Sequence, residues 1–245
     1  MGKTTIIMPV WISNDELYDL TDKALVSLRE TIGGYDELII IDNGSPIGGD
    51  QLQKVSEICI RNKTNLGYAK AVNQGFKLAS GDFITVANND IRVSSNWLII
   101  AREIFERLPK AGSVHFRMIG YDENTITGDE IWVTGKERWC SSSFYIIRKE
   151  AISKGGYDEN YGLGGGEDWD FWKRVRDNGW ETVYTNGAYY QHKDSSTSNT
   201  RNLKEREESD KKAAELFKQK FGVAREVLFE KEYPGQLRQP WRPFP

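Results

Sequence analysis

Short apolar runs alternate with helix-like segments through the first half of the 245-residue chain. Thr5–Val10, Glu37–Ile41 and Phe83–Ala87 are predicted strands, because each is a brief aliphatic run bordered by turn-forming residues. A further short strand is predicted at 59–61, and segments with helical apolar spacing lie at 15–31, 51–58, 68–79 and 97–107. This alternation predicts an α/β fold with a parallel sheet whose faces are covered by helices. In such sheets, ligands bind beyond the carboxyl ends of the strands.

The second half of the chain is less regular. Candidate strands lie at 113–118, 139–147 and 182–184, and two helices are predicted at 167–178 and 200–221. Gly179 is a typical residue to end the first of these helices. The tail from Tyr233 carries four of the seven prolines and is predicted to be irregular. We therefore expect one domain over 1–199, followed by a C-terminal helix and irregular tail over 200–245.

Charge and cysteine content exclude some classes of function. The net charge of −3 and the pI near 5.6 give no basic surface for nucleic acid. Cys59 and Cys140 form neither a disulfide framework nor a metal-binding spacing, which favours a reducing compartment. The apolar run Thr5–Val10 is too short for a signal peptide or a membrane span. These features predict a soluble cytoplasmic protein.

Polar residues follow two of the predicted strands directly. Asp42 opens a dense turn, so its carboxylate either caps backbone amides or accepts a hydrogen bond from a nucleotide base or ribose. Asn88, Asn89 and Asp90 follow the third strand. This triplet is either a plain turn or a site for Mg²⁺ or Mn²⁺, which prefer oxygen ligands. The residues alone leave both alternatives open at each strand end.

A glycine run at 164–166 leads into an acidic segment with interleaved aromatic side chains. Its first carboxylates, Glu167 and Asp168, suit the positively polarised first turn of a helix, so a solvated helix start is one interpretation. The other interpretation is a general base. Neighbouring aromatic rings lower the local dielectric, which can raise the pKa of a carboxyl group toward a value suited to taking a proton from a hydroxyl. The aromatic residues concerned are Trp169, Phe171 and Trp172.

The chain has two histidines, and their contexts differ. His115 lies in an apolar, strand-like run and is predicted to be a core or edge residue. His192 follows a candidate strand and is either structural or a metal ligand. Asp170, near Lys173 and Arg174, is predicted to form a structural ion pair.

With these residues assembled, the chain from about Thr4 to His192 resembles glycosyltransferase family 2. The resemblance implies the glycosyltransferase A fold, with a Rossmann-like, mostly parallel sheet flanked by helices and here a C-terminal helical extension. It also implies a nucleotide-binding half at about 1–95 and an acceptor half at about 96–199.

Three motifs carry the resemblance in the nucleotide-binding half. Met8–Trp11 is similar to the opening strand and nucleotide-contacting loop of the family, and Ile41–Ser45 is similar to its base-recognising aspartate motif. The segment 65–75, continued by 79–82, is similar to the Asn-x-Gly…Asn-x-Gly helix. The resemblance implies nucleotide contacts by Pro9, Val10, Trp11, Asp42, Asn65, Gly67, Lys70, Asn88 and Asn89.

Two further motifs imply the metal site and the catalytic base. Asn88–Asp90 occupies the Asp-x-Asp position of the family, with asparagine in place of the first acid. The resemblance implies that Asp90 and His192, with Asn88, hold Mn²⁺ or Mg²⁺. The pair Glu167–Asp168 matches an acceptor-side motif whose second acid is the catalytic base, which makes Asp168 the expected base and Glu167 the second catalytic candidate.

Aromatic residues are expected to shape the acceptor side, because rings pack well on the C–H faces of sugars. Trp139 and Trp169 are the stacking candidates, although Trp169 could equally pack in the core. Phe144 is predicted to be a core residue. Ser141 and Gly166 complete the predicted acceptor-binding set.

The resemblance implies an inverting, metal-dependent glycosyltransferase. Its donor would be a nucleotide-diphosphate sugar and its acceptor a glycan, a lipid-linked molecule or a protein, in glycan or polysaccharide assembly. Peripheral contact with the inner face of a membrane is compatible with the sequence. A nucleotidyltransferase is one alternative, although Pro9–Ser13 lacks the Gly-rich, basic phosphate loop typical of that class. A non-catalytic nucleotide-sugar-binding module is the other, opposed by the intact Asp90, Asp168 and His192.

Overall fold

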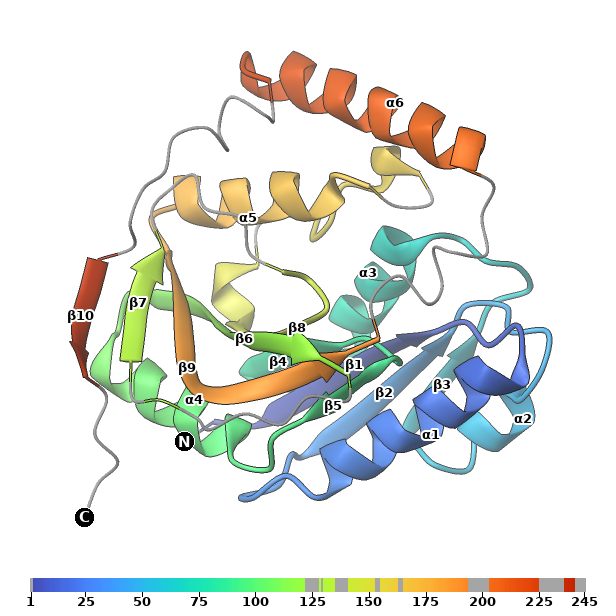
Figure 1. Ribbon diagram of the computed structural model, residues 1–245, viewed down its shortest axis with the longest axis horizontal. Coiled ribbons are helices and arrows are strands. Elements are labelled where there is room, and N and C mark those ends of the chain that lie inside the picture. The colour runs from blue at the N-terminus through green and yellow to red at the C-terminus, as the bar shows by residue number, and fades with distance from the viewer. Residues whose placement is uncertain are drawn as a thin grey trace.

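The computed structural model describes residues 2–121, 128, 130–134, 141–152, 155–162, 165–193, 203–224 and 236–240. These residues form one sheet with helices on its faces (Figure 1). The strand order is β10-β7-β9-β6-β8-β4-β1-β2-β3, with β5 paired to β9.

The N-terminal part of the sheet is parallel, as the alternating pattern predicts. It contains β1 (Thr4–Val10), β2 (Glu37–Asp42), β3 (Ile58–Arg61) and β4 (Phe83–Ala87). The connecting helices are α1 (Asp15–Arg29), α2 (Gly49–Leu52), α3 (Tyr68–Leu78) and α4 (Trp97–Arg107). Since parallel strands point the same way, the ends of β1, β2 and β4 lie along one edge of the sheet.

Alternate side chains of β1 face two different layers. Ile6 and Met8 belong to the cluster that contains α1 and α4, whereas Ile7 belongs to the cluster that contains α3 and α5 (Glu167–Asp177). The period of two along a strand thus explains why β1 is buried on both faces. Gly75 of α3 lies directly against the Ile7 side chain, so a Cβ atom added to Gly75 would overlap it.

The second part of the sheet is mostly antiparallel. β8 (Phe144–Arg148) pairs with both β4 and β6 (Ala111–Gly120), and β7 (Glu130–Thr134) pairs with β9 (Glu181–His192). Among the described pairings of these strands, only the pairing of β6 with β9 is parallel. The short β5 (Ile91–Val93) pairs with the end of β9. Two 3₁₀ turns, at Lys149–Ala151 and Glu159–Tyr161, lead toward α5.

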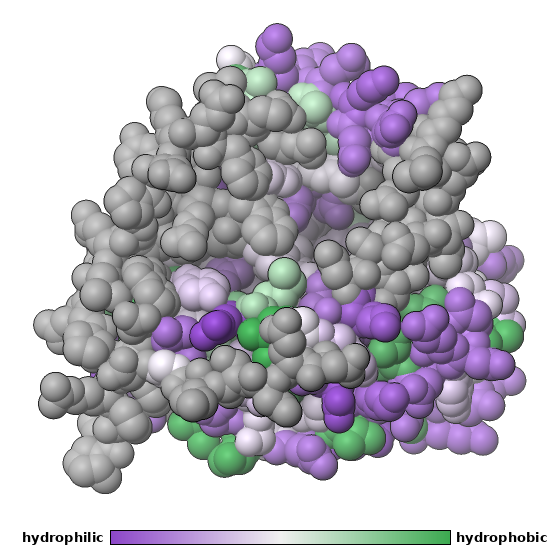
Figure 2. Space-filling view, in the orientation of Figure 1, coloured by the Kyte–Doolittle hydropathy of each residue, from purple (hydrophilic) through white to green (hydrophobic). Residues whose placement is uncertain are grey.

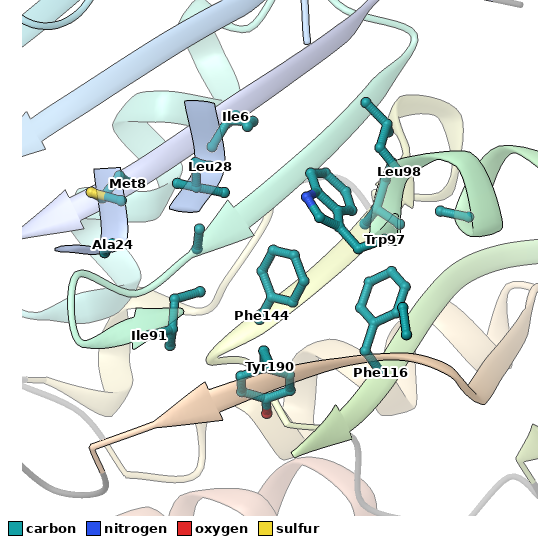
Figure 3. Close-up of a cluster of buried hydrophobic side chains, with 14 of the residues drawn as sticks. Ile6, Met8, Ala24, Leu28, Ile91, Trp97, Leu98, Phe116, Phe144 and Tyr190 are labelled. Carbon is teal, nitrogen blue, oxygen red and sulfur yellow. The ribbon is translucent and has the colours of Figure 1, made fainter. Parts of the chain in front are cut away.

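An aromatic cluster holds the two parts together. Trp97, Phe116 and Phe144 pack edge to face or tilted, with ring centroids 5.0–6.0 Å apart. Tyr190 of β9 joins this cluster, and its hydroxyl points away from Phe144 and Trp97 (Figure 3). Phe144 is fully buried, so its predicted core role is confirmed. His115 is also buried, as predicted.

The C-terminal helix α6 (Leu203–Phe221) packs above α5 (Figure 1). Ala213 and Phe217 are buried. Lys220 pairs with Asp158, at 2.6 Å, and with Asp170 at the start of α5. No helix in the described ranges combines the length and apolarity that crossing a bilayer requires.

Two predictions about the second half were wrong or incomplete. The tail was expected to be irregular, but β10 (Gln236–Pro240) pairs antiparallel with β7. The strand expected at 182–184 instead runs from Glu181 to His192, with a register shift against β6 after Phe116. Both differences depend on pairing with strands distant in sequence, which local apolar spacing does not reveal.

Replacing Gly75 with alanine should destabilise the fold by about 1–3 kcal/mol, because an added methyl group must displace Ile7 from a packed core. Chemical denaturation would measure the free energy of unfolding. Lys77→Ala, at an exposed position of the same helix, is the control and should change it little. Equal stability of the two variants would contradict the close contact between α3 and β1.

Candidate functional site

The segment Asn88–Asp90 follows β4 and leads into β5, at the carboxyl edge of the parallel strands. The backbone amide of Asn88 donates to the carbonyl of Ser143, at 2.8 Å. The Asn89 side chain points into the protein, where its amide donates to Thr21 Oγ1 of α1, at 2.8 Å. The structure thus gives Asn89 an anchoring contact, whereas its predicted nucleotide contact stays a prediction.

Antiparallel pairing of β5 with β9 brings Asp90 next to His192. Ile91 pairs with His192 in register, and the amide of Lys193 donates to the Asp90 carbonyl, at 3.0 Å. As a result, Asp90 Oδ1 lies 3.3 Å from His192 Nε2, and both side chains are nearly buried, with 7% and 9% of their surface exposed.

Several polar atoms in this cluster have no hydrogen-bond partner among the described residues. They are Asp90 Oδ1, Asn88 Oδ1 and both ring nitrogens of His192. Asp90 Oδ1 and His192 Nε2 are therefore close to each other but not aligned for a hydrogen bond. Buried polar groups are nearly always satisfied in folded proteins, so orphaned atoms of this kind need an explanation.

These donor atoms fit a divalent cation. Carboxylate, amide oxygen and imidazole are ligands that Mn²⁺ accepts, and a catalytic site leaves further positions for substrate oxygens. The described residues contain no group of three His, Cys, Asp or Glu side chains suited to a metal. A cation at this cluster would need Asn88 as its third protein ligand, and a bound diphosphate would supply others.

Asp42, at the end of β2, is fully buried and has two protein partners. Its Oδ1 accepts from the Ser45 amide, at 2.8 Å, and its Oδ2 lies 3.1 Å from Arg61 Nε. The turn-capping role considered for Asp42 is thus present, together with an ion pair that the sequence did not indicate. Arg61 in turn lies 2.7 Å from the exposed Asp50.

A network of amide side chains fixes the loop before α3. Asn43 donates to Asn65 Oδ1, at 2.9 Å, and accepts from the Leu66 amide, at 3.0 Å. Asn65 Oδ1 also accepts from the Gly67 amide. Gly67 has φ 90°, a conformation that favours glycine, and it directly precedes α3. Lys70 in the first turn of α3 is exposed.

The remaining predicted nucleotide-contacting residues lie at the end of β1. Val10 is buried, whereas Pro9 and Trp11 are partly exposed. The Val10 carbonyl accepts from the Asn43 amide, at 2.7 Å, which joins the ends of β1 and β2.

The start of α5 presents the two candidate catalytic acids differently. Gly165 and Gly166 have φ 117° and 95°, so the chain can turn sharply into the helix. Glu167 is buried and accepts from the Gly165 amide, at 2.5 Å. Asp168 is partly exposed and accepts from the Trp169 amide, at 2.9 Å. Asp168 is thus the acid better placed to meet a substrate.

Other residues of α5 have structural roles. Asp170 is fully buried and pairs with Arg174, at 2.5 Å, which confirms the predicted ion pair. Trp169 is partly exposed, so the choice between stacking on a substrate and packing in the core stays open. Trp139 lies outside the described residues.

The segment Ser141–Ser143 connects the metal-binding candidates with α5. Ser141 Oγ accepts from the Tyr190 hydroxyl, at 3.0 Å, and the Ser143 carbonyl accepts from Asn88. Between them, Ser142 Oγ accepts from Trp172 Nε1 of α5, at 3.1 Å. The structure thus links the two predicted halves of the site through one short segment.

Charge also indicates that these parts are close together. Burial raises the pKa of Tyr68 well above its ordinary value, and nearby Tyr157, Glu167 and Asp168 raise it further. The Tyr68 hydroxyl donates to the Ser142 carbonyl, at 2.6 Å.

On the face shown in Figure 2, the surface is hollowed beneath the hydrophilic residues of α6, where Figure 1 draws the start of α5 above α3.

Three contributors to the site were missed in the sequence: Tyr68, Arg61 and Ser142. Tyr68 stands inside a recognised motif, so it could have been noticed. Arg61 ends β3, which pairs with β2, the strand that ends at Asp42. The pairing of these two strands could have indicated the ion pair between Arg61 and Asp42. A serine among three consecutive serines carries no such signal.

Solved structures similar to this chain have the glycosyltransferase A fold. GalNAc-T7, in a crystal structure with UDP, GalNAc and Mn²⁺, superposes with a TM-score of 0.62 at 14% identity, covering 78% of this chain and 43% of that one. S. aureus TarS gives a TM-score of 0.64 at 18% identity over 95% of this chain, which spans 46% of TarS. Its 1–349 fragment with UDP gives 0.62 at 16% identity, with 95% and 75% covered.

The sequence itself assigns the family. Residues 5–158 match the family described as "Glycosyl transferase family 2", and the chain belongs to this family. None of the curated protein sequences matches the chain.

Replacing Asp90 with asparagine should weaken Mn²⁺ binding by about tenfold or more, because the cluster loses its one carboxylate. Titration calorimetry with Mn²⁺ would measure this. Asp19→Asn, at an exposed position of α1, is the matched control. Unchanged Mn²⁺ affinity in Asp90→Asn would contradict cation binding by this cluster.

The stability that the contact between Lys220 of α6 and Asp158 contributes should depend on pH. Burial alone would raise the pKa of Asp158, but hydrogen bonds from Lys220 and the Asn160 amide outweigh it and hold the pKa below its ordinary value of 3.8. A lowered folded-state pKa stabilises the protein above the unfolded-state pKa, and this stabilisation is lost as pH falls through the folded-state value. We expect Lys220→Met to lower the melting temperature near pH 7 and the difference from wild type to shrink below about pH 4.

Thermal melts from pH 7 to pH 3 would test this expectation. Lys218→Met, which removes an exposed charge from the same last turn of α6, is the control. A difference between Lys220→Met and wild type that stays constant over this range would contradict the role assigned to Asp158.

Proposed function

We propose that this chain is an inverting, metal-dependent glycosyltransferase that moves a sugar from a nucleotide-diphosphate sugar to a hydroxyl group of an acceptor. The family assignment supports the reaction class. The observation that carries the metal-dependent part is the buried Asp90–His192 pair, whose facing atoms lie 3.3 Å apart without forming a hydrogen bond. The acceptor would be a glycan, a lipid-linked molecule or a protein.

The donor would bind along the carboxyl edge of β1, β2 and β4. Asp42 and the loop held by Asn65 would surround the nucleoside, while Lys70 and the start of α3 would face the diphosphate. Asp90, His192 and Asn88 would hold Mn²⁺ or Mg²⁺, whose charge would neutralise the diphosphate as it leaves. UDP and Mn²⁺ are the first ligands to test, because the similar structure of GalNAc-T7 contains both and that of the TarS fragment contains UDP.

Asp168 would act as the general base. As an acceptor hydroxyl attacks the anomeric carbon, its proton passes to the Asp168 carboxylate, the new carbon–oxygen bond forms, and the bond to the diphosphate breaks. Attack from the face opposite the leaving group inverts the anomeric centre. The partial exposure of Asp168 supports this assignment over the buried Glu167, which already accepts from Gly165.

The acceptor would lie next to the start of α5. Trp169 is partly exposed there and would offer a ring to a sugar face, with Gly166 and Ser141 nearby in the proposed acceptor site. Assembly of a glycan or polysaccharide is the process that we propose for this reaction.

Replacing Asp168 with asparagine should reduce metal-dependent sugar transfer or donor hydrolysis by about 10²–10⁴-fold, because the amide cannot accept the acceptor proton. UDP release from a panel of UDP-sugars with Mn²⁺ would measure this, and calorimetry should show UDP binding retained. Asp177→Asn, which makes the same change at the far end of α5, is the control. Near-normal turnover in Asp168→Asn would refute the base assignment.

A further inference from the structure

Ser142 receives hydrogen bonds from three separate parts of the protein. Its Oγ accepts from Trp172 Nε1, at 3.1 Å, and from the Tyr157 hydroxyl, at 3.0 Å. Its carbonyl accepts from the Tyr68 hydroxyl, at 2.6 Å. These partners come from α5, from the loop before the second 3₁₀ turn, and from the first residue of α3.

The contact with Trp172 fixes the helix that carries the proposed base. Trp172 follows Asp168 by four residues on α5, so the two side chains lie on the same face of the helix. The bond from Trp172 to Ser142 therefore connects the face of α5 that carries Asp168 to the segment Ser141–Ser143. Trp172 is almost fully buried, which leaves its indole N–H no access to water in place of this partner.

The neighbours of Ser142 fix the metal-binding candidates. Ser143 accepts from the amide of Asn88, and Ser141 accepts from Tyr190, two residues before His192. Consecutive residues thus contact both the strand ends that carry Asp90 and His192 and the helix that carries Asp168. Because protein interiors are closely packed, a shift at one residue of so short a segment also moves its neighbours.

We propose that Ser142 is a positioning residue that sets the distance between Asp168 and the cation-binding cluster. It acts through Trp172 and α5 and does not itself transfer a proton. The inference rests on the proposed function. Displacing a catalytic group by about 1 Å can cost a factor of 10² in rate, so the loss of this one hydroxyl should be visible in turnover.

The test compares turnover with donor binding in Ser142→Ala. The expected result is a kcat for Mn²⁺-dependent UDP release that falls by about 10- to 100-fold, with a KM for the UDP-sugar within about twofold of wild type. Ser142→Thr, which keeps the hydroxyl, should restore much of kcat. Tyr145→Phe is the matched control, because the Tyr145 hydroxyl bonds Tyr157 within the same network but does not touch Ser142.

A double-mutant cycle separates positioning from a general loss of stability. Ser142→Ala and Trp172→Phe break the same bond, so their combined effect on kcat should be smaller than the product of the separate effects. Thermal melts of each variant would accompany the kinetics. Fully multiplicative effects, or an equal loss of kcat in Tyr145→Phe, would overturn the proposal.

The outcomes also distinguish this inference from the proposed function. If wild type releases UDP with Mn²⁺ and Asp168→Asn does not, while Ser142→Ala keeps normal kcat, the positioning role alone is wrong. If wild type releases no nucleoside diphosphate from any nucleotide-diphosphate sugar, whichever base it carries, the proposed function and this inference fail together.

Discussion

The pairing of β5 with β9 is the interaction on which the candidate site depends. Strands β1, β2 and β4 bring their own ends together, but of the candidate metal ligands they supply only Asn88 and Asp90. The antiparallel ladder from Ile91 to Val93 adds His192, and the aromatic cluster around Phe144 supports β9 from the other side. Burial shields the Asp90–His192 pair from solvent, and its facing atoms have no hydrogen-bond partner among the described residues.

The site is assembled from both parts of the sheet, and each part contributes a different kind of group. The parallel part offers strand ends and the loop before α3, which suit a nucleotide and its phosphates. The antiparallel part offers α5, whose first turn lies beyond two glycines. Asp168 and His192 stand on a helix and a strand, whereas Asn88 and Asp90 lie in the short turn between β4 and β5. Hydrogen bonds to Asn43 and Ser142 hold the loops between these elements.

The sequence predicted the parts of the site that local patterns determine. Asp42 and Asp90 were located from the strand ends, and Asp168 from the glycine run before a helix. That His192 lies next to Asp90 was implied only by the family resemblance, because it depends on a three-residue strand that the apolar pattern does not reveal. The Arg61 ion pair and the Ser142 contacts also join distant segments, and such pairing is decided by the folded chain as a whole.

The strand β10 has a consequence for how the protein behaves toward other molecules. It covers the outer side of β7 and becomes the last strand described at that end of the sheet. An uncovered strand offers unpaired amides and carbonyls to any extended peptide, which favours aggregation. The register shift between Leu237 and Gln239 interrupts the ladder, and Pro240 has no amide hydrogen to donate. Among the described residues, the strand at this end of the sheet is therefore poorly suited to recruiting another.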